Sequence, residues 1–316
     1  MNPRPRPRSR PGPVYLGLDG GGTSTTVVAT DAAGSELARI RGAAGIVDPA
    51  DPGARAGALA ALARRALDAA GAAPPAAAFC CALAGAGREP ERRAIRDALA
   101  RLEVAREIHV VGDIEAAFHD AFAAGPGLLV IAGTGSIAWG RAEDGRTARA
   151  GGWGHLLGDE GSGYAVGLAA LRAVVRAHDG RAPATALREH VLAHVCARAP
   201  EELIAWAATA AKADVAALAP LVAGAAAAGD AVARALVERA ACDLADHVRA
   251  LHTRLRPWAR EADIAFAGGL LGQDGPLREL AAAAIHALGL PLRIREEPVD
   301  AARGAAALAR AAVPVS

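Results

Sequence analysis

The chain has 316 residues, of which 53% are hydrophobic and 22% charged, a balance typical of a soluble globular protein with room for two domains. The formal net charge is +1, so no global field favours nucleic acid or an anionic membrane as a partner. No apolar run reaches the roughly 20 residues of a membrane-spanning helix, and no apolar segment of a secretory signal follows the basic start. We therefore expect a cytoplasmic protein that binds neither nucleic acid nor membrane.

The first thirteen residues alternate proline with arginine, and we expect residues 1–13 to be a disordered tail because they offer no apolar surface to bury. Residues 14–122 have the pattern of one domain. Strands are expected at 14–19, 25–31, 34–42, at the start of 76–87 and at 107–113. Helices are expected at 52–71, 90–102 and 114–125. This order predicts an α/β fold with a mixed sheet covered by helices on both faces.

The opening pattern returns in the second half, which we expect to be a second domain at 123–316. Residues 127–145 again read as a strand, a turn of glycine, threonine and serine, and a second strand. The turn after Asp19 and the turn after Ala132 occupy the same place in the two units, which indicates an internal duplication of architecture. A helical insertion is expected at about 162–255, then a strand at 263–271 and a closing helix at 299–312.

The four cysteines are Cys80, Cys81, Cys196 and Cys242. Neighbouring residues of a strand point to opposite faces, so Cys80 and Cys81 are not expected to pair with each other. The chain has no CxxC motif and no cysteine–histidine spacing typical of zinc. We expect reduced and mostly buried thiols, as is usual in a cytoplasmic protein.

The two glycine turns are candidate phosphate cradles. Glycine lets several backbone N–H groups converge on an anion, and the threonine and serine hydroxyls add donors. The alternative is a plain β-hairpin turn, which the duplication of the pattern disfavours. A Walker A loop is excluded because no lysine follows the glycines: the only lysine, Lys212, is far away in the sequence. A dinucleotide fingerprint is excluded because a strand, and not a helix, follows.

Five stretches carry a resemblance to a known superfamily: "DGGGTST", "GDIEAAF", "IAGTGSIAWG", "GGWGHLLGDEGSGYAVG" and "AFAGGLL". In this order they resemble the sugar kinase/Hsp70/actin superfamily, from about Val14 to Ala312. Within it, the chain is similar to the N-acetylglucosamine kinases and the BadF/BadG/BcrA/BcrD ATPases. The resemblance implies two actin-like (ribonuclease H-like) ATPase domains with a cleft between them, and the use of ATP and Mg²⁺.

The nucleotide would be held by the two turns and by a glycine pair after a later strand. The resemblance implies that Gly268 and Gly269 contact adenosine, although a strand-to-helix turn explains them equally well from the sequence alone. The residues expected to bind the nucleotide are Gly20, Gly21, Gly22, Thr23, Ser24, Thr134, Gly135, Gly268 and Gly269.

Two aspartates at strand ends are candidates for the chemistry. Asp19 would hold Mg²⁺ through water, or it serves only the turn beside it. Asp113 precedes a helix, and its position alone favours a helix N-cap. The resemblance implies instead that Asp113 is the catalytic base, which takes the proton from the attacking sugar hydroxyl.

The glycine-rich stretch 151–163 is the candidate sugar site. The resemblance implies that Gly152–Gly154 lies by an N-acetyl group and that Asp159 binds the sugar, and carboxylates accept hydrogen bonds from hydroxyl groups well. The alternative is a rigid loop that caps the following helix. The residues expected to bind the substrate are Ser136, Gly152, Trp153, Gly154, Asp159 and Glu160.

The leading interpretation is an ATP-dependent amino-sugar kinase that phosphorylates a hydroxyl, most simply at C6, of N-acetylglucosamine, glucosamine or N-acetylmuramic acid. The alternative is a BcrA/BadF-type ATPase that activates a partner reductase through a cysteine-bound cluster. A sugar-sensing regulator would need a longer DNA-binding segment than the basic tail. One departure from the family pattern makes the identity of the sugar less certain. Gly45 or Ile46 stands where related proteins carry an asparagine that contacts the sugar, and Asp48 is a candidate to supply that contact instead. The sequence leaves open whether the protein forms a homodimer.

Overall fold

The structure is a computed structural model that describes residues 12–21, 24–43, 52–84 and 89–313. It divides into two compact units, Met1–Ala123 with Asp300–Ser316 (unit 1) and Ala124–Val299 (unit 2). The chain therefore leaves unit 1, builds unit 2 and returns to unit 1. This division differs from the expected boundary, which places the whole of 123–316 in the second domain.

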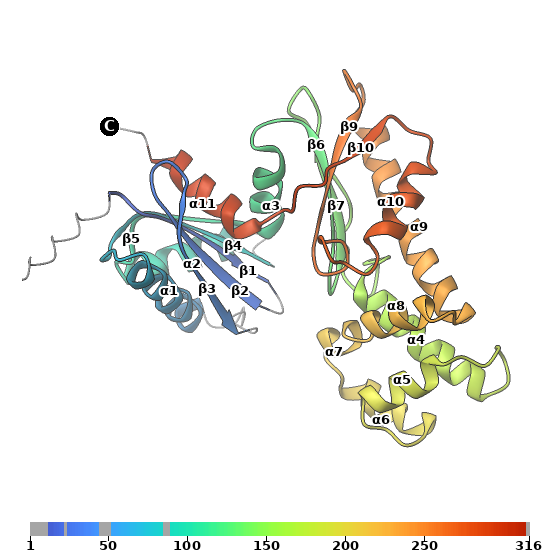
Figure 1. The fold of residues 1–316 in the computed structure, drawn as a ribbon. Coiled ribbons are helices and arrows are strands. Elements are labelled where there is room, and N and C mark those ends of the chain that lie inside the picture. The colour runs from blue at the N-terminus through green and yellow to red at the C-terminus, as the bar shows by residue number, and fades with distance from the viewer. Residues whose placement is uncertain (1–11, 22–23, 44–51, 85–88, 314–316) are drawn as a thin grey trace, which may run out of the picture. The chain divides into compact units, whose positions relative to one another are not determined.

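Unit 1 is built on a five-stranded mixed sheet in the order β3-β2-β1-β4-β5 (Figure 1). Strand β1 pairs antiparallel with β2 and parallel with β4, and β4 pairs parallel with β5. The carboxyl ends of β1, β4 and β5 therefore meet at one edge of the sheet. The strands are β1 (Tyr15–Gly20), β2 (Ser24–Thr30), β3 (Glu36–Ala43), β4 (Ala76–Leu83) and β5 (Ala105–Gly112).

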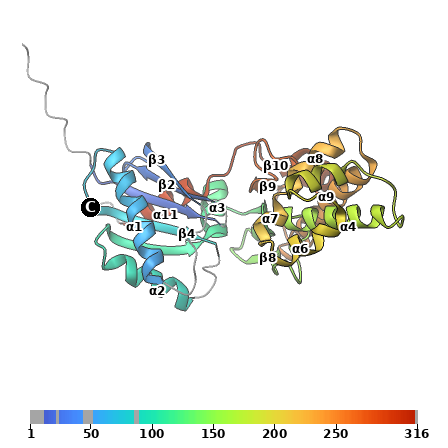
Figure 2. The ribbon, with the colours of Figure 1, turned by 90° about the horizontal axis from the view of Figure 1, so that it is seen from below.

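Helices cover both faces of this sheet (Figures 1 and 2). Leu16 and Leu18 of β1 belong to the core under α1 (Pro52–Ala69) and α2 (Glu89–Ala100). Tyr15 belongs to the core under α3 (Asp113–Phe122) and α11 (Ala301–Ala312). The alternation of side chains along a strand explains this division, because consecutive residues face opposite sides.

The cysteines follow the same alternation in β4. Cys80 packs in the core with α11 and Cys81 in the core with α1, so the two thiols lie on opposite faces, as expected. Both are free and buried. Cys196 and Cys242 are also free, but they are exposed, so the expectation of mostly buried thiols is wrong for half of them.

Helix α11 belongs to unit 1 because small residues let it lie directly on the sheet. A Cβ on Gly17 of β1 would overlap the backbone of Ala302 and Ala306. A Cβ on Gly304 would overlap the carbonyl oxygen of Ala116 in α3. The guanidinium of Arg303 also donates to Asp120 of α3, over 2.6 and 2.7 Å. The order of elements along the chain does not show that α11 packs on the sheet of unit 1, so a domain boundary drawn from that order alone assigns α11 to the second domain.

Unit 2 repeats the sheet of unit 1, in the order β8-β7-β6-β9-β10 and with the same strand directions. The strands are β6 (Gly127–Ala132), β7 (Ser136–Arg141), β8 (Thr147–Gly151), β9 (Ala262–Ala267) and β10 (Leu292–Ile294). The repeat agrees with the duplication that the glycine turns indicate in the sequence.

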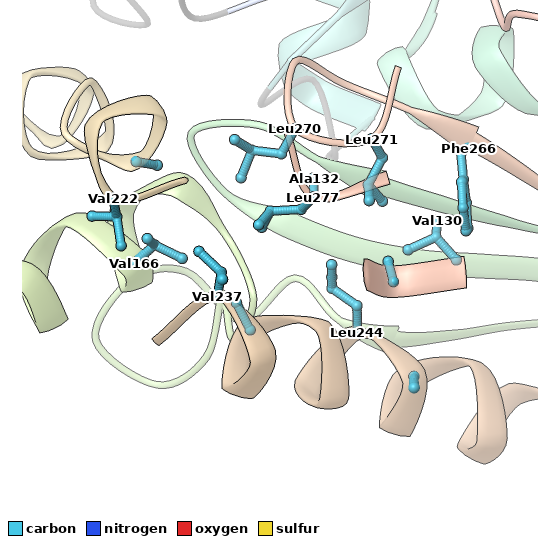
Figure 3. Close-up of a cluster of buried hydrophobic side chains, with 14 of the residues drawn as sticks. Val130, Ala132, Val166, Val222, Val237, Leu244, Phe266, Leu270, Leu271 and Leu277 are labelled. Carbon is cyan, nitrogen blue, oxygen red and sulfur yellow. The ribbon is translucent and has the colours of Figure 1, made fainter. Parts of the chain in front are cut away.

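Helices form most of the chain between β8 and β9, and α10 (Arg278–His286) follows β9. The intervening helices are α4 (Gly163–His178), α5 (Leu187–His194), the 3-10 helix Pro200–Glu202, α6 (Leu203–Thr209), α7 (Lys212–Ala216), α8 (Ala219–Ala227) and α9 (Ala231–Arg254). Figure 3 shows how their apolar residues pack: Leu244 of α9 lies near Val130 of β6, and Val237 of α9 lies beside Val166 of α4.

Membrane-spanning character is weak in the described residues. Within them, no single helix has both the length and the apolar composition needed to cross a bilayer. The segments Lys212–Ala227 and Ala231–Arg254 reach that composition only when taken together, and they are bent by 120° against each other.

The packing of α11 predicts opposite effects for two Gly→Ala substitutions in helices of unit 1. Gly304→Ala should destabilise the protein by about 1–3 kcal/mol, because the added methyl group would overlap the Ala116 carbonyl. Gly57→Ala in α1, where a Cβ would meet nothing within 4 Å, should stabilise it by roughly 0.5–1 kcal/mol. Urea denaturation of both variants measures the difference, and equal effects would contradict the close packing of α11.

Candidate functional site

The turn between β6 and β7 has the free N–H groups of an anion-binding turn. The N–H of Gly133 donates to the Gly135 carbonyl over 2.9 Å and closes the turn. The N–H groups of Thr134 and Gly135 donate to no acceptor within the described part of the chain. The turn rests on the first residues of α4, because Gly163 and Tyr164 donate to the carbonyls of Gly133 and Thr134 over 2.8 and 3.3 Å. Free donors before a helix N-terminus favour a phosphate.

The glycine pair after β9 lies beside this turn. Gly268 has a φ of +87°, and a Cβ there would overlap the backbone of Ala132, the residue that ends β6. The N–H of Leu270 donates to the same Ala132 carbonyl over 3.0 Å. A Cβ on Gly133 would lie 3.9 Å from the backbone nitrogen of Gly269. Unit 2 therefore brings together the four nucleotide-binding residues expected in it.

The corresponding turn of unit 1 is described only in part. The N–H of Gly21 donates to the Ser24 carbonyl over 3.1 Å, and Gly20 accepts from the N–H of Ala84 over 3.0 Å. Gly22 and Thr23 lie outside the described residues, as do Gly45, Ile46 and Asp48. The expectations for those residues stay predictions.

Asp19 and Asp113 stand at the carboxyl edge of the unit 1 sheet, at the ends of β1 and β5. Burial raises the pKa of Asp19 from 3.8 to about 6, with further increases from the neighbouring charges of Asp113 and Asp300. Burial also raises the pKa of Asp113, against hydrogen bonds that lower it. In the described part of the chain neither carboxylate forms an ion pair. Two such carboxylates without a cation are costly to keep ionised.

Asp113 is the first residue of α3, and the N-cap is Gly112, whose extended backbone precedes the helix. The N-cap assignment that its position favours is therefore wrong by one residue. Oδ1 of Asp113 accepts the N–H of Ile114 over 3.0 Å, so the positive end of α3 stabilises its ionised form.

Asp300 is a neighbour that the sequence does not reveal. It caps α11 by accepting the N–H groups of Ala302 and Arg303, and its Oδ2 lies 2.7 Å from the Arg39 guanidinium. Its charge contributes to the raised pKa of Asp19, although 281 residues of chain separate them.

The loop after β8 presents its indole to solvent. Trp153 is 63% exposed, and the guanidinium of Arg149 lies over the ring, 4.5 Å from its centroid. Arg149 also donates to the Gly152 carbonyl over 3.0 Å. Gly152 and Gly154 both have positive φ, +68° and +80°, which residues with a Cβ rarely adopt. One face of the indole is therefore covered by a cation.

Asp159 is held more tightly than the sequence suggests. It is buried and has a φ of +60°, a left-handed backbone conformation that residues with a Cβ rarely adopt. Oδ2 lies 2.6 Å from Nζ of Lys212, and Oδ1 accepts the N–H of Ser136 over 3.4 Å. Lys212 is thus close to the β6–β7 turn in space, although 53 residues separate it from Asp159.

Two other residues expected at the substrate are engaged differently. The Ser136 hydroxyl donates to the Glu160 carbonyl over 2.6 Å, and its role at the substrate stays a prediction. The Glu160 side chain is exposed, and its Oε2 lies 3.7 Å from Nε2 of His247. Among the described residues, no group of three or more histidines, cysteines or carboxylates could hold a metal ion. The expected cleft between the units stays a prediction.

Comparisons with known proteins agree with this arrangement. A model described as the BadF/BadG/BcrA/BcrD ATPase family matches residues 16–309. The N-acetylmuramic acid/N-acetylglucosamine kinase of Clostridium acetobutylicum is 35% identical over 196 residues, which are 61% of this chain and 64%, less than two thirds, of that protein. The N-acetyl-D-glucosamine kinase of Dictyostelium discoideum is 29% identical over 94% of this chain and 97% of its own length.

A solved structure of a candidate N-acetylglucosamine kinase from Chromobacterium violaceum is also similar. The sequence identity is 30%, the TM-score is 0.77, and the match covers 94% of this chain and 99% of that one. This likeness, together with the repeated sheet, confirms the α/β fold of two actin-like units that the sequence predicts.

The raised pKa of Asp19 predicts a pH-dependent stability. The carboxyl group of Asp19 keeps its proton up to about pH 6 in the folded chain, but only up to about pH 3.8 in the unfolded chain. The free energy of unfolding therefore falls as the pH rises from 3.8 to about 6, and above pH 6 ionised Asp19 destabilises the fold. Asp19→Asn should therefore stabilise the protein at pH 7.5, without nucleotide or metal, by up to about 3 kcal/mol, and the gain should vanish below pH 4.

The matched control is Asp31→Asn in unit 1. Backbone hydrogen bonds around Ser35 lower the pKa of Asp31, so its charge stabilises the fold above the unfolded-state pKa, and the substitution should destabilise the protein at pH 7.5. Denaturant titrations from pH 3.5 to 7.5 measure both. A loss of stability in Asp19→Asn at pH 7.5 would contradict the electrostatic account.

Proposed function

The chain belongs to the BadF/BadG/BcrA/BcrD ATPase family, and we propose that it is an ATP-dependent kinase that phosphorylates an amino sugar. The substrate class is N-acetylglucosamine or a close relative, and the acceptor is the hydroxyl at C6. The observation that carries the proposal is the pair Asp19 and Asp113, two carboxylates without a cation at the edge where three parallel strands end.

Asp113 would accept the proton of the sugar hydroxyl. A base must be ionised at the working pH and close enough to its proton, and the N–H of Ile114 supports the ionised form. Burial raises the pKa of Asp113, which makes the carboxylate a stronger base than one in water. The oxygen freed of its proton would attack the γ-phosphorus of ATP, and the bond from that phosphorus to the bridging oxygen of ADP would break.

Asp19 would hold Mg²⁺. The residues present fit this ion, because a hard cation prefers carboxylate oxygens and would stabilise the ionised form of Asp19, whose pKa is raised by burial and by the charges of Asp113 and Asp300. When bound, Mg²⁺ would neutralise charge on the phosphates. Asp19, with the backbone of Gly20 and Gly21 beside it, would orient the nucleotide from unit 1.

The turn with Thr134 and Gly135 would bind phosphate from unit 2, with Gly268 and Gly269 toward adenosine. Asp159, whose Oδ2 is held by Nζ of Lys212 over 2.6 Å, would accept hydrogen bonds from hydroxyl groups of the sugar. Trp153 would cover an apolar sugar face with the side of the indole that Arg149 leaves open.

The alternative, an ATPase that activates a reductase through cysteine-bound iron and sulfur, finds little support in the thiols. Cluster ligands are thiolates. Burial raises the pKa of Cys80 to about 12 and raises the pKa of Cys81 well above its ordinary value, so burial disfavours the thiolate of both. Cys196 and Cys242 are exposed on separate segments of unit 2.

A coupled assay of ADP release tests the activity itself. Purified protein with ATP and Mg²⁺ should release ADP only when an amino sugar is added, and phosphorus NMR of the product should place the phosphate on O6. N-acetylglucosamine, glucosamine, N-acetylmuramic acid, N-acetylmannosamine and glucose form the panel. The absence of turnover with every sugar, in a protein that binds ATP, would overturn the kinase proposal.

The role of Asp113 is tested by Asp113→Asn. Loss of a general base should lower kcat by about 10²- to 10⁴-fold, while ATP affinity stays close to that of the wild type. Asp97→Asn, the same substitution at an exposed carboxylate of α2, should leave kcat unchanged. A near-normal kcat in Asp113→Asn would show that another group accepts the proton.

A further inference from the structure

Lys212 is the only lysine of the chain, and the fold places its ammonium against a nearly dry carboxylate. The Asp159 side chain is 5% exposed, whereas that of Lys212 is 34% exposed. Their 2.6 Å contact is therefore unlike a surface ion pair, which solvent would screen. Removing one partner of such a pair leaves an uncompensated charge in a poorly solvated place.

The buried carboxylate lies directly behind the candidate phosphate turn. Its Oδ1 accepts the N–H of Ser136 over 3.4 Å, and a Cβ on Gly135 would lie 3.0 Å from its Oδ2. A full negative charge thus contacts the same turn whose free N–H groups face an expected anion. Without neutralisation, that charge would repel phosphate at short range in a medium less polar than water.

Close packing fixes the lysine in this position. Lys212 begins α7, and α7 lies on α4 at two glycines: a Cβ on Gly167 would overlap the Val215 carbonyl, and one on Gly163 would lie 3.2 Å from the Ala216 carbonyl oxygen. The first N–H groups of α4 in turn bind the β6–β7 turn. The turn, the carboxylate and the lysine therefore share one rigid frame.

We propose that Lys212 is a positioning residue for the nucleotide, which neutralises Asp159 so that the β6–β7 turn can accept a polyphosphate. The inference rests on the proposed function and adds a requirement to it. Sugar hydroxyls need Asp159 as an anion, whereas the phosphate of ATP on the neighbouring turn needs that charge compensated. Lys212 reconciles the two needs, because its ammonium lies 2.6 Å from Oδ2 of Asp159 and cancels much of the field of that carboxylate at the turn.

The test is a double-mutant cycle on ATP binding in the absence of sugar. Isothermal titration with ATP and Mg²⁺ should show a Kd about 10- to 100-fold higher in Lys212→Met, because Asp159 is then unpaired. Lys212→Arg should recover most of the affinity. Asp159→Asn alone should change the ATP Kd little, and the double variant Lys212→Met with Asp159→Asn should bind ATP nearly as well as Asp159→Asn.

Two outcomes would overturn the proposal. If the double variant binds ATP as weakly as Lys212→Met, the lysine acts on the phosphate directly and not through Asp159. If Lys212→Met melts at a lower temperature but binds ATP normally, its role is structural only. Arg234→Met, which removes an exposed cation of α9, is the matched control and should change neither quantity. A wild-type protein that binds no ATP would instead contradict the proposed function.

Discussion

Parallel pairing of strands is the constraint on which both candidate half-sites depend. In unit 1 the pairing of β1 with β4 and of β4 with β5 aligns three carboxyl ends, and Asp19 and Asp113 follow two of them. In unit 2 the pairing of β6 with β9 sets the turn after Ala132 beside Gly268. The backbone register thus decides which side chains meet before any of those side chains interacts.

The two units differ in whether a cation lies beside their buried carboxylates. Unit 1 leaves its two strand-end carboxylates without cations in the described residues, and the pKa of each rises. Unit 2 compensates its buried carboxylate with Lys212. Two carboxylates without a cation lower the stability of the folded protein and favour the binding of a cation. Proteins commonly lose stability where function requires such an arrangement. The proposed role of Lys212 rests on this difference.

Features set by local sequence could be predicted, and features set by distant contacts could not. The glycine turns, the strands beside them and Asp113 at the end of β5 follow from patterns within about ten residues. The same patterns, in duplicate, predict the repeated sheet. In contrast, the contact of Lys212 with Asp159 spans 53 residues, and nothing near Lys212 in the sequence marks it as a partner. The placement of α11 on β1 depends on Gly17 and Gly304, whose small size serves a contact that exists only after folding.

The return of the chain to unit 1 has a consequence for its synthesis. Unit 2 is one continuous segment, so it can fold as soon as it emerges, whereas the sheet of unit 1 must wait for residues 301–312, which cover one of its faces. Until then Tyr15, Cys80 and Gly17 lack the cover that α11 gives them. The unit that is synthesised first is therefore the unit completed last.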